Sequence, residues 1–461
     1  MINLENKNKN LLSYFNYIVF LFLISCIILF DRNFVHINFK IFGFPIYIVE
    51  IFIIIICIFV LLNFCIYRDK KIFTGYELKI EHILLISILL ISLVTGLIKY
   101  GNTYVFRHSA ILYYSIFSFL VPTIFINIKQ FKIFSIVSIF IIFFNSIIYL
   151  TASNFTIGGF TYYYQGIFLF IIINSLIFLE NKLVNSIQIL IAAVIIYEII
   201  DRQVRAAWIA FLIAILFNLV LLIIFRKKLG IKKSFYWKAS LIVVLTILLI
   251  VSLNFLNLRT VGNKVIDNTA TTSKTETVSV PIKTDLKTKI ISYIDEFKSI
   301  FNFNSSNSVS ANNATWRTIL WKDIIKKSMQ KPILGYGFGM LYNNETVKDM
   351  GWEYGADVGF LDPHNSYLSI LYRTGIVGLL IFLLFIISFF IKMIRFLRDC
   401  LDLKISVYMI SILSAVIFIL VISFFMVVLE GPFLGIFLWV FIGLALSLTN
   451  IYDKKIKSIE N

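Results

Sequence analysis

The sequence Asp362-Pro363-His364-Asn365-Ser366-Tyr367-Leu368 ends the one long polar segment of the chain and leads into an apolar run. Asp362 can cap a helix, and Pro363 suits the first turn, where its missing N–H needs no partner. We therefore expect His364 in the first turn of a helix, where the positive end of the helix dipole disfavours imidazolium. A neutral imidazole can act as a general base, although a capped helix whose histidine only faces water is equally consistent with these residues.

The rest of the chain is strongly apolar, because 59% of its 461 residues are hydrophobic and the mean hydropathy is +0.91. Soluble domains do not have this composition, so we predict an all-α polytopic membrane protein. The net charge of +17 lies in short clusters between apolar runs. This pattern argues against nucleic-acid binding and for charge asymmetry across a bilayer. The 4 cysteines lie in or beside apolar runs and form neither a disulfide pattern nor a metal-binding pattern.

Apolar runs of about 20 residues, the length that crosses a bilayer, recur along the chain. They predict twelve transmembrane helices, at about 11–30, 41–66, 82–98, 109–127, 133–150, 162–179, 184–200, 206–225, 239–257, 374–391, 404–427 and 431–449. The chain then divides into helices 1–9 (residues 1–257), one large extracytoplasmic loop with short helices (258–365), and helices 10–12 with a tail (366–461).

Lysines and arginines cluster in every second connection, as at Arg226–Lys233 and Lys392–Arg398. Because such clusters mark the cytoplasmic side, both termini are predicted to lie in the cytoplasm and residues 258–365 outside. The first apolar run lacks a small-residue cleavage site after it, so we expect it to be a retained helix.

Arginines on the predicted outer side are few and therefore informative. Arg202 and Arg205 stand three residues apart, on one face where the eighth helix is expected to begin. Cations at a helix N-terminus oppose the dipole, and arginine near a membrane is costly unless it is paired or hydrated. Two arginines here indicate an anion-binding site, and the alternative is that they reach to lipid headgroups.

Within the long loop, residues 285–301 have an amphipathic helical pattern, residues 302–315 are predicted to be a loop, and residues 316–330 a helix. Arg317 and Trp321 are four residues apart and so share a face of that helix. Gly335-Tyr336-Gly337-Phe338-Gly339 then predicts a tight turn that exposes the backbone. No Gly-Lys-Ser/Thr follows this turn, so it is not a phosphate-binding loop of the nucleotide type.

From Arg317 onward the chain resembles the O-antigen ligase and polymerase superfamily of bacterial envelope enzymes. The resembling segments occur in the family's order: Trp316-Arg317-Thr318-Ile319-Leu320-Trp321, Lys331-Pro332-Ile333-Leu334-Gly335-Tyr336-Gly337-Phe338-Gly339, His364-Asn365-Ser366-Tyr367-Leu368-Ser369-Ile370-Leu371 and Gly375-Ile376-Val377-Gly378-Leu379. Arg205-Ala206-Ala207-Trp208 is a looser match. The family usually has a small hydroxyl residue before that arginine, whereas this chain has Val204, so the choice between Arg202 and Arg205 stays open.

The resemblance implies glycosyl transfer, without a metal, from an undecaprenyl-pyrophosphate-linked glycan to an acceptor glycan or glycolipid. It also implies a bacterial inner (cytoplasmic) membrane protein with its active site on the outer face. The residues fit this chemistry, since arginine pairs bidentately with phosphate and a neutral histidine can take a hydroxyl proton. The outer side has no DxD motif and no His/Cys cluster, so we predict neither a metal nor a cofactor.

We assign the site residues accordingly. His364 is the predicted catalytic base. Four arginines are candidates for binding the pyrophosphate: Arg205, Arg317, Arg202 and Arg107. Asn365 and Tyr367 are expected to orient the acceptor or the imidazole ring.

Our first prediction is a polymerase that joins lipid-linked repeat units into O-antigen or capsular polysaccharide by inverting transfer. Its partners would be the lipid-linked donor, the acceptor, the bilayer and a chain-length regulator, with no nucleic acid. A ligase that moves finished glycan to a lipid A core or another acceptor uses the same leaving group and is the close alternative. A flippase for the same lipid-linked sugar is the alternative from another class, but transporters are expected to place charges at mid-membrane.

Overall fold

The fold is described from a computed structural model, which describes residues 2–41, 44–67, 78–151, 161–178, 181–202, 204–255, 309–342 and 363–460. The helices of the first part of the chain are α1 (Ile2–Phe30), α2 (Arg32–Val35), α3 (Ile48–Tyr67), α4 (Lys79–Lys99), α5 (Tyr104–His108), α6 (Ala110–Tyr114), α7 (Phe117–Ile124), α8 (Ile128–Thr151), α9 (Thr161–Ser175), α10 (Lys182–Asp201), α11 (Arg205–Ile224) and α12 (Lys233–Phe255). The later helices are α14 (Val309–Ser328), α16 (Ser366–Asp399), α17 (Leu403–Ile422) and α18 (Leu434–Glu460).

The described chain is mostly helical, as a polytopic membrane protein requires, because lipid offers no partners to backbone N–H and C=O groups. By length and composition, 8 helices could cross a membrane, namely α1, α4, α8, α10, α11, α16, α17 and α18. The four other predicted spans coincide with α3, the pair α6 and α7, α9, and α12, which are not among these 8. Twelve spans therefore stay a prediction.

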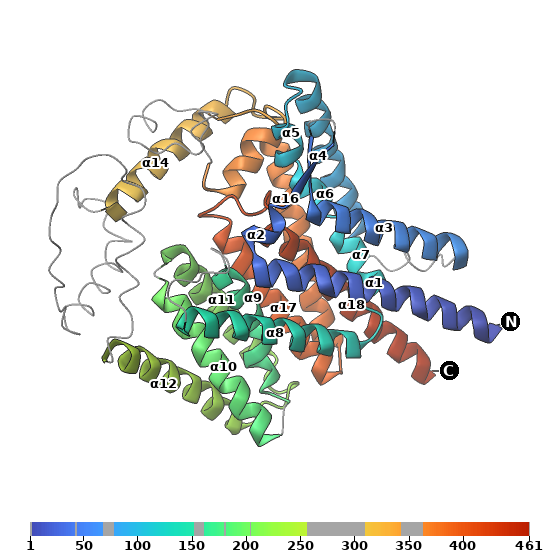
Figure 1. The fold of residues 1–461 in the computed structure, drawn as a ribbon, viewed down its shortest axis with the longest axis vertical. Coiled ribbons are helices and arrows are strands. Elements are labelled where there is room, and N and C mark those ends of the chain that lie inside the picture. The colour runs from blue at the N-terminus through green and yellow to red at the C-terminus, as the bar shows by residue number, and fades with distance from the viewer. Residues whose placement is uncertain are drawn as a thin grey trace.

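Helices α17 and α18 form the centre of the bundle, and 89% of each apolar stretch is buried. Helix α17 packs against α9, α11 and α18, and α18 packs against α7. Helix α14 and the two chain termini lie on opposite sides of the molecule (Figure 1). The molecule therefore has one end that carries α14 and another at which the terminal helices leave the bundle.

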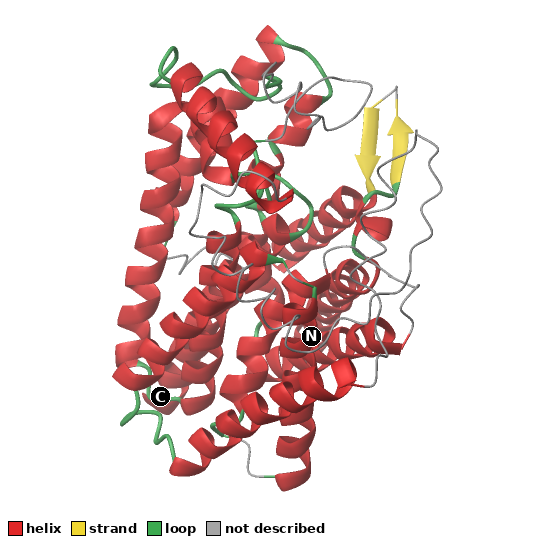
Figure 2. Cartoon of the chain, turned by 90° about the vertical axis from the view of Figure 1, so that its left-hand side faces the viewer, coloured by secondary structure: helices red, strands yellow, loops and turns green. Residues whose placement is uncertain are grey.

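Two predicted spans differ in the structure for identifiable reasons. The run 41–66 begins as a hairpin of β1 (Asn38–Ile41) and β2 (Phe44–Tyr47), paired antiparallel with Asn38 opposite Tyr47, and only then becomes α3 (Figure 2). Pro45 lies in β2, and a proline disfavours a helix interior because it has no N–H. The run 109–127 is divided into α6 and α7, where the Ser115 hydroxyl donates to Leu112 O at 2.6 Å and so competes with helical hydrogen bonding.

The long polar segment also differs in one place. Helix α14 begins at Val309, so the residues from 309 to 315 are helical and the predicted loop is shorter. The reason is that one turn of polar residues such as Asn312 and Asn313 extends a helix whose stability comes from the buried Leu320 and Ile324 further along. The predicted amphipathic helix at 285–301 lies outside the described residues.

Candidate functional site

The segment Pro363–Asn365 directly precedes α16, and its capping residue is not the predicted one. Asn365 is the N-cap, because its side-chain oxygen accepts hydrogen bonds from Tyr367 N at 2.9 Å and Leu368 N at 3.0 Å. The helix therefore begins at Ser366, and His364 lies before it with a left-handed φ of 48°. The prediction that His364 occupies the first turn is wrong, and Asp362 lies outside the described residues.

His364 nevertheless has the protonation state that was predicted, for a different reason. Burial first, and then the positive charge of Arg317, lower the pKa of His364 to about 4. Both effects disfavour imidazolium, so the ring is neutral at neutral pH. A neutral imidazole beside a fixed cation can accept a proton while the cation stabilises a nearby anion.

Helix α14 brings Arg317 near this histidine. Trp321, one turn after Arg317, donates a hydrogen bond from Nε1 to Pro363 O at 2.9 Å. Arg317 is close enough to His364 to interact with it electrostatically. Trp321 thus contacts Pro363, and Arg317 lies near the next residue, His364. Both come from one face of α14, which confirms that Arg317 and Trp321 share a face.

The glycine turn after α14 fixes this helix against α16. Tyr336 N donates to Tyr372 O at 3.0 Å, and Gly337 N donates to Arg373 O at 2.9 Å. Gly335 and Gly337 have φ values of 67° and 90°, which favour glycine because L side chains rarely adopt them. The prediction of a tight turn is confirmed, but the prediction that it exposes its backbone is wrong, because the glycines are buried and the turn's N–H groups bond to neighbouring helices.

The same turn also contacts α4. Phe338 N donates to Ser92 O at 3.1 Å, and a Cβ added to Gly96 would lie only 2.1 Å from Phe338 O. This close backbone approach needs glycine at position 96. The glycine turn is therefore a rigid connection between α4, α14 and α16, and it determines where Arg317 lies.

Ser366 connects the start of α16 to the residues that follow α17. Its hydroxyl donates to Met426 O at 2.9 Å and accepts from Val428 N at 3.0 Å, while its backbone N donates to Ser423 O at 2.8 Å. Met426 in turn accepts a hydrogen bond from the Tyr163 hydroxyl. Because its hydroxyl is already used as donor and acceptor, Ser366 positions the backbone beside His364 and is not suited to act as a nucleophile.

Three arginines from distant segments gather around the tyrosines that begin α9. The Arg202 guanidinium lies 5.6 Å from the centre of the Tyr162 ring, and the rings of Tyr162 and Tyr163 are 4.1 Å apart. Arg317 and Arg32 both interact electrostatically with Tyr163. The structure therefore brings together Arg32 of α2, Arg202 at the end of α10 and Arg317 of α14.

Arg202 differs from Arg317 because a buried carboxylate holds it. Its Nε and Nη2 donate to Glu198 Oε1 at 2.9 and 2.7 Å, and the Glu198 side chain is 0% exposed. Gln165 also donates to Glu198, and the Arg202 guanidinium lies 4.2 Å from the centre of the Tyr149 ring. Glu198, which looks isolated in the sequence, compensates the charge of Arg202 and makes it a weaker candidate for binding phosphate.

The other candidate arginines lie elsewhere or are only partly described. Arg205 is the first residue of α11, which starts without a side-chain cap, and its side chain lies outside the described part of the structure. Arg107 is exposed in α5, where its electrostatic neighbours include His36 and His108. The structure thus brings Arg317 and Arg202 to the tyrosines of α9, whereas Arg107 acts on His36, a residue that Arg32 also influences.

The two residues expected to orient the acceptor both have structural partners. The Asn365 side-chain oxygen caps α16, and the Tyr367 hydroxyl donates to Leu420 O at 2.7 Å. The Tyr367 ring packs 4.8 Å from that of Phe424. These contacts anchor the start of α16 to α17, so acceptor binding by either residue stays a prediction.

Sequence reasoning did not select several residues that the structure places at this site. Asp31 is 0% exposed and its backbone φ is 45°. Its carboxylate accepts a hydrogen bond from the Tyr164 hydroxyl at 3.1 Å, and this contact places the next residue, Arg32, beside the α9 tyrosines. Two features of the sequence could have pointed to these residues. Three consecutive tyrosines, 162–164, precede one apolar run, and Asp31 and Arg32 directly follow the first apolar run of the chain. Neither signal shows by itself that the two segments meet.

Binding of a metal ion would need several His, Cys, Asp or Glu side chains close together. Within the described ranges, no group of three or more His, Cys, Asp or Glu side chains is placed to hold a metal ion. The expectation of metal-independent chemistry stays a prediction.

Comparison with known proteins gives one family. Residues 189–383 match the sequence model of a family described as O-antigen ligase. A comparison with curated proteins finds no match. The matched range begins within α10, contains α11, α12 and α14, and ends in α16, and it therefore includes Arg202, Arg205, Arg317 and His364.

Proposed function

The chain is a member of the O-antigen ligase and polymerase superfamily, and from this we propose that it transfers a glycan from undecaprenyl pyrophosphate to a hydroxyl group of an acceptor glycan or glycolipid. The observation that carries the proposal is the pairing of Arg317 with His364, whose pKa is lowered to about 4. A cation beside a neutral base provides the two functions that this transfer needs.

The proposed reaction proceeds by inversion at the donor sugar. The acceptor oxygen attacks C1 of the donor sugar, while the bond from C1 to the pyrophosphate oxygen breaks and its electron pair leaves with the pyrophosphate. His364 takes the acceptor proton, and Arg317 stabilises the negative charge that develops on the leaving group. Arg205 would add a second guanidinium to the leaving group, and His364 returns its proton to water afterwards.

Within this class, we propose polymerization of lipid-linked repeat units as the first assignment, on the composition of the chain, which is rich in Ile, Phe, Asn and Lys. The ligase is a second candidate, because the matched family is described as O-antigen ligase. Purified protein supplied only with lipid-linked repeat units separates the two. A ladder of lengthening products indicates a polymerase, whereas a ligase leaves the donor unchanged until a separate acceptor is added.

The same reaction tests the proposal against a flippase. A glycosyltransferase releases undecaprenyl pyrophosphate in detergent, where there are no two membrane sides between which a lipid could be moved. A flippase would release none under these conditions. Absence of release with both donor and acceptor present, in protein that is folded, would reject the glycosyltransferase.

The outer location of the site is a proposal that rests on the distribution of lysine and arginine. It can be tested in a variant without the native cysteines that carries either Gln330→Cys, after α14, or Leu401→Cys, after α16, since both positions are exposed. In intact cells whose outer membrane is permeable to the reagent, a membrane-impermeant thiol reagent should label position 330 and spare position 401. The reverse pattern would place the site in the cytoplasm.

A further inference from the structure

A cavity of about 430 Å³ lies between the C-terminal ends of α16 and α18. Its lining comprises Lys392, Arg395, Phe396, Asp399, Cys400, Tyr452, Asp453 and Ile456. Helix α16 begins beside His364 and is interrupted at Gly375, where φ is 70°. From Ile376 to Asp399 it rises about 36 Å, at about 1.5 Å per residue, and this part ends at the cavity. Such a length exceeds the hydrocarbon core of a bilayer, so the cavity lies near the opposite membrane face.

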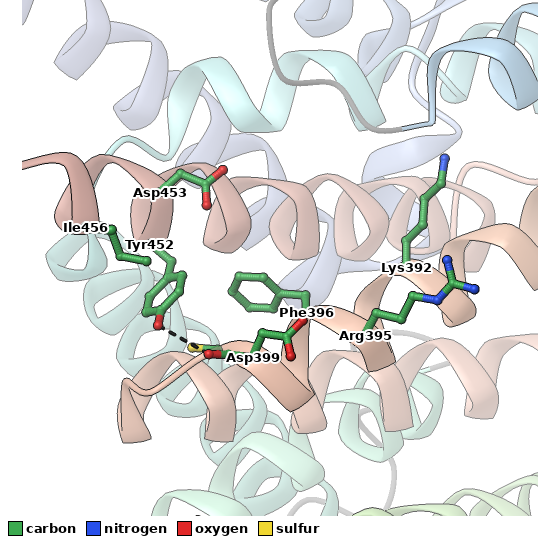
Figure 3. A pocket seen from close by; sticks show the side chains of 8 residues that line it. Lys392, Arg395, Phe396, Asp399, Tyr452, Asp453 and Ile456 are labelled. Carbon is green, nitrogen blue, oxygen red and sulfur yellow. Dashed lines mark hydrogen bonds between the residues drawn. The ribbon is translucent and has the colours of Figure 1, made fainter.

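The charges in the cavity are separated by sign. Lys392 and Arg395 lie at one end, Tyr452 and Asp453 at the other, and Phe396 and Asp399 between them (Figure 3). Arg395 and Asp399 are four residues apart on α16, which corresponds to about 6 Å along the helix. A ligand with a negative and a positive group at a similar spacing would be complementary to this lining.

The four charged side chains that line the cavity differ in their partners. In the part of the chain that the structure describes, the side chains of Arg395 and Asp453 form neither an ion pair nor a hydrogen bond. Lys392 pairs with Glu81 at 2.9 Å, and Asp399 pairs with its neighbour Arg398 at 3.0 Å in an exposed pair. Exposed pairs contribute little and exchange readily, so Asp399 can also serve a ligand.

An apolar stripe on α16 leads to this cavity. Large exposed hydrophobic residues recur at spacings of three and four residues along one side of the helix: Leu380, Leu384, Ile387, Ile391 and Ile394. Such a stripe on a membrane helix faces lipid, and it ends next to Arg395. The molecule that reaches the cavity along this path has an apolar chain and a charged head.

We propose that this cavity binds the headgroup of a phospholipid with a primary ammonium group, of the ethanolamine type. The phosphate lies at Lys392 and Arg395, the ammonium group lies at Asp399 and Asp453, and the acyl chains follow the stripe from Ile394 to Leu380. The short ethanolamine linker spans the step from Arg395 to Asp399, which is about 6 Å along the helix. An ammonium group donates hydrogen bonds to carboxylates, which a choline headgroup cannot do.

The proposal is tested by native mass spectrometry of the purified full-length protein with equimolar phosphatidylethanolamine, phosphatidylglycerol and phosphatidylcholine of identical acyl chains. We expect the wild type to retain phosphatidylethanolamine in preference to the other two. Asp453→Asn should reduce this preference about two- to fivefold and keep phosphatidylglycerol, because exposed charge pairs have energies of this order. Arg395→Gln should weaken retention of both phosphatidylethanolamine and phosphatidylglycerol.

Lys454→Gln changes an exposed charge next to Asp453 but outside the cavity, so it should leave the preference unchanged. Asp399→Asn provides a second acidic variant if Asp453→Asn does not fold. Equal retention of the three lipids by the wild type, or an unchanged preference in both acidic variants, would overturn the proposal. Displacement of the lipid by millimolar glycerophosphoethanolamine would overturn the lipid assignment in favour of a soluble ligand, since the acyl chains are part of the proposed contact.

Discussion

Arg317 and Arg373 lie on neighbouring helices and have different neighbours. Arg373 donates from Nη1 to Glu430 Oε1 and Oε2 at 2.6 and 2.5 Å, and each side chain of this pair is 7% exposed. Arg202 has a similar buried partner in Glu198. Arg317, by contrast, lies beside His364 and lowers its pKa.

This contrast shows that an arginine near the membrane surface has two distinct uses. A glutamate that is buried with the arginine compensates its charge, and the pair then joins helices, as Arg373 and Glu430 join α16 to the residues before α18. An arginine beside a neutral base can instead stabilise an anion that forms during a reaction. The first kind should matter for stability and the second for turnover.

The largest expected effect on turnover is that of His364→Ala. It removes the proposed proton acceptor and leaves the arginines in place, so turnover should fall by about 10²–10⁴-fold, the usual contribution of general base catalysis. Release of undecaprenyl pyrophosphate by purified protein measures it. His36→Ala, which changes an exposed histidine, is the control and should keep turnover. Wild-type turnover in folded His364→Ala would exclude the general-base role.

Replacing Arg317 with lysine should have the next largest effect. Lysine keeps the charge but loses the planar fork that pairs with phosphate oxygens. Loss of one charged hydrogen bond costs about 1.5–3 kcal/mol, or roughly ten- to a hundredfold in rate. Arg226→Lys is the matched control, because Arg226 is exposed and follows the C-terminal end of α11, the end opposite Arg205. If the two variants are equally active, Arg317 is not distinguished from an ordinary surface arginine.

Glu430→Gln should affect turnover least and stability most. Removing one partner leaves Arg373 buried without its counterion, which costs about 3–5 kcal/mol. We expect a lower midpoint of thermal unfolding in detergent, with turnover per folded molecule close to that of the wild type. An unchanged midpoint together with a large loss of turnover would mean that this pair belongs to the reaction and not to the scaffold.

Patterns that depend on neighbouring residues were predicted well from the sequence. Helical spacing placed Arg317 and Trp321 on one face, and the glycines 335, 337 and 339 predicted a tight turn, because both follow from local backbone geometry. The cap of α16 was assigned three residues too early, since Asp362 and Asn365 are both good caps and the sequence does not show which one bonds to the helix.

Contacts between distant segments could not be predicted. Glu198 looked isolated although Arg202 follows it by four residues, a spacing that the sequence shows, whereas its other partner, Gln165, is recognisable only when α9 and α10 are placed together. The position of Arg32 near Tyr163 likewise depends on how α1 meets α9. The low pKa of His364 was expected from a helix dipole, whereas burial and the distant Arg317 cause it.

The most direct test of the account is the pH dependence of kcat/KM in the wild type and in Arg317→Gln. Turnover needs neutral His364, so activity should be constant above about pH 5 and fall on the acid side near the pKa of about 4. The Arg317 charge lowers this pKa, so Arg317→Gln should shift the acid limb to higher pH, while Arg202→Gln should leave it in place. An acid limb that is identical in the wild type and Arg317→Gln would contradict the pairing of Arg317 with the catalytic base.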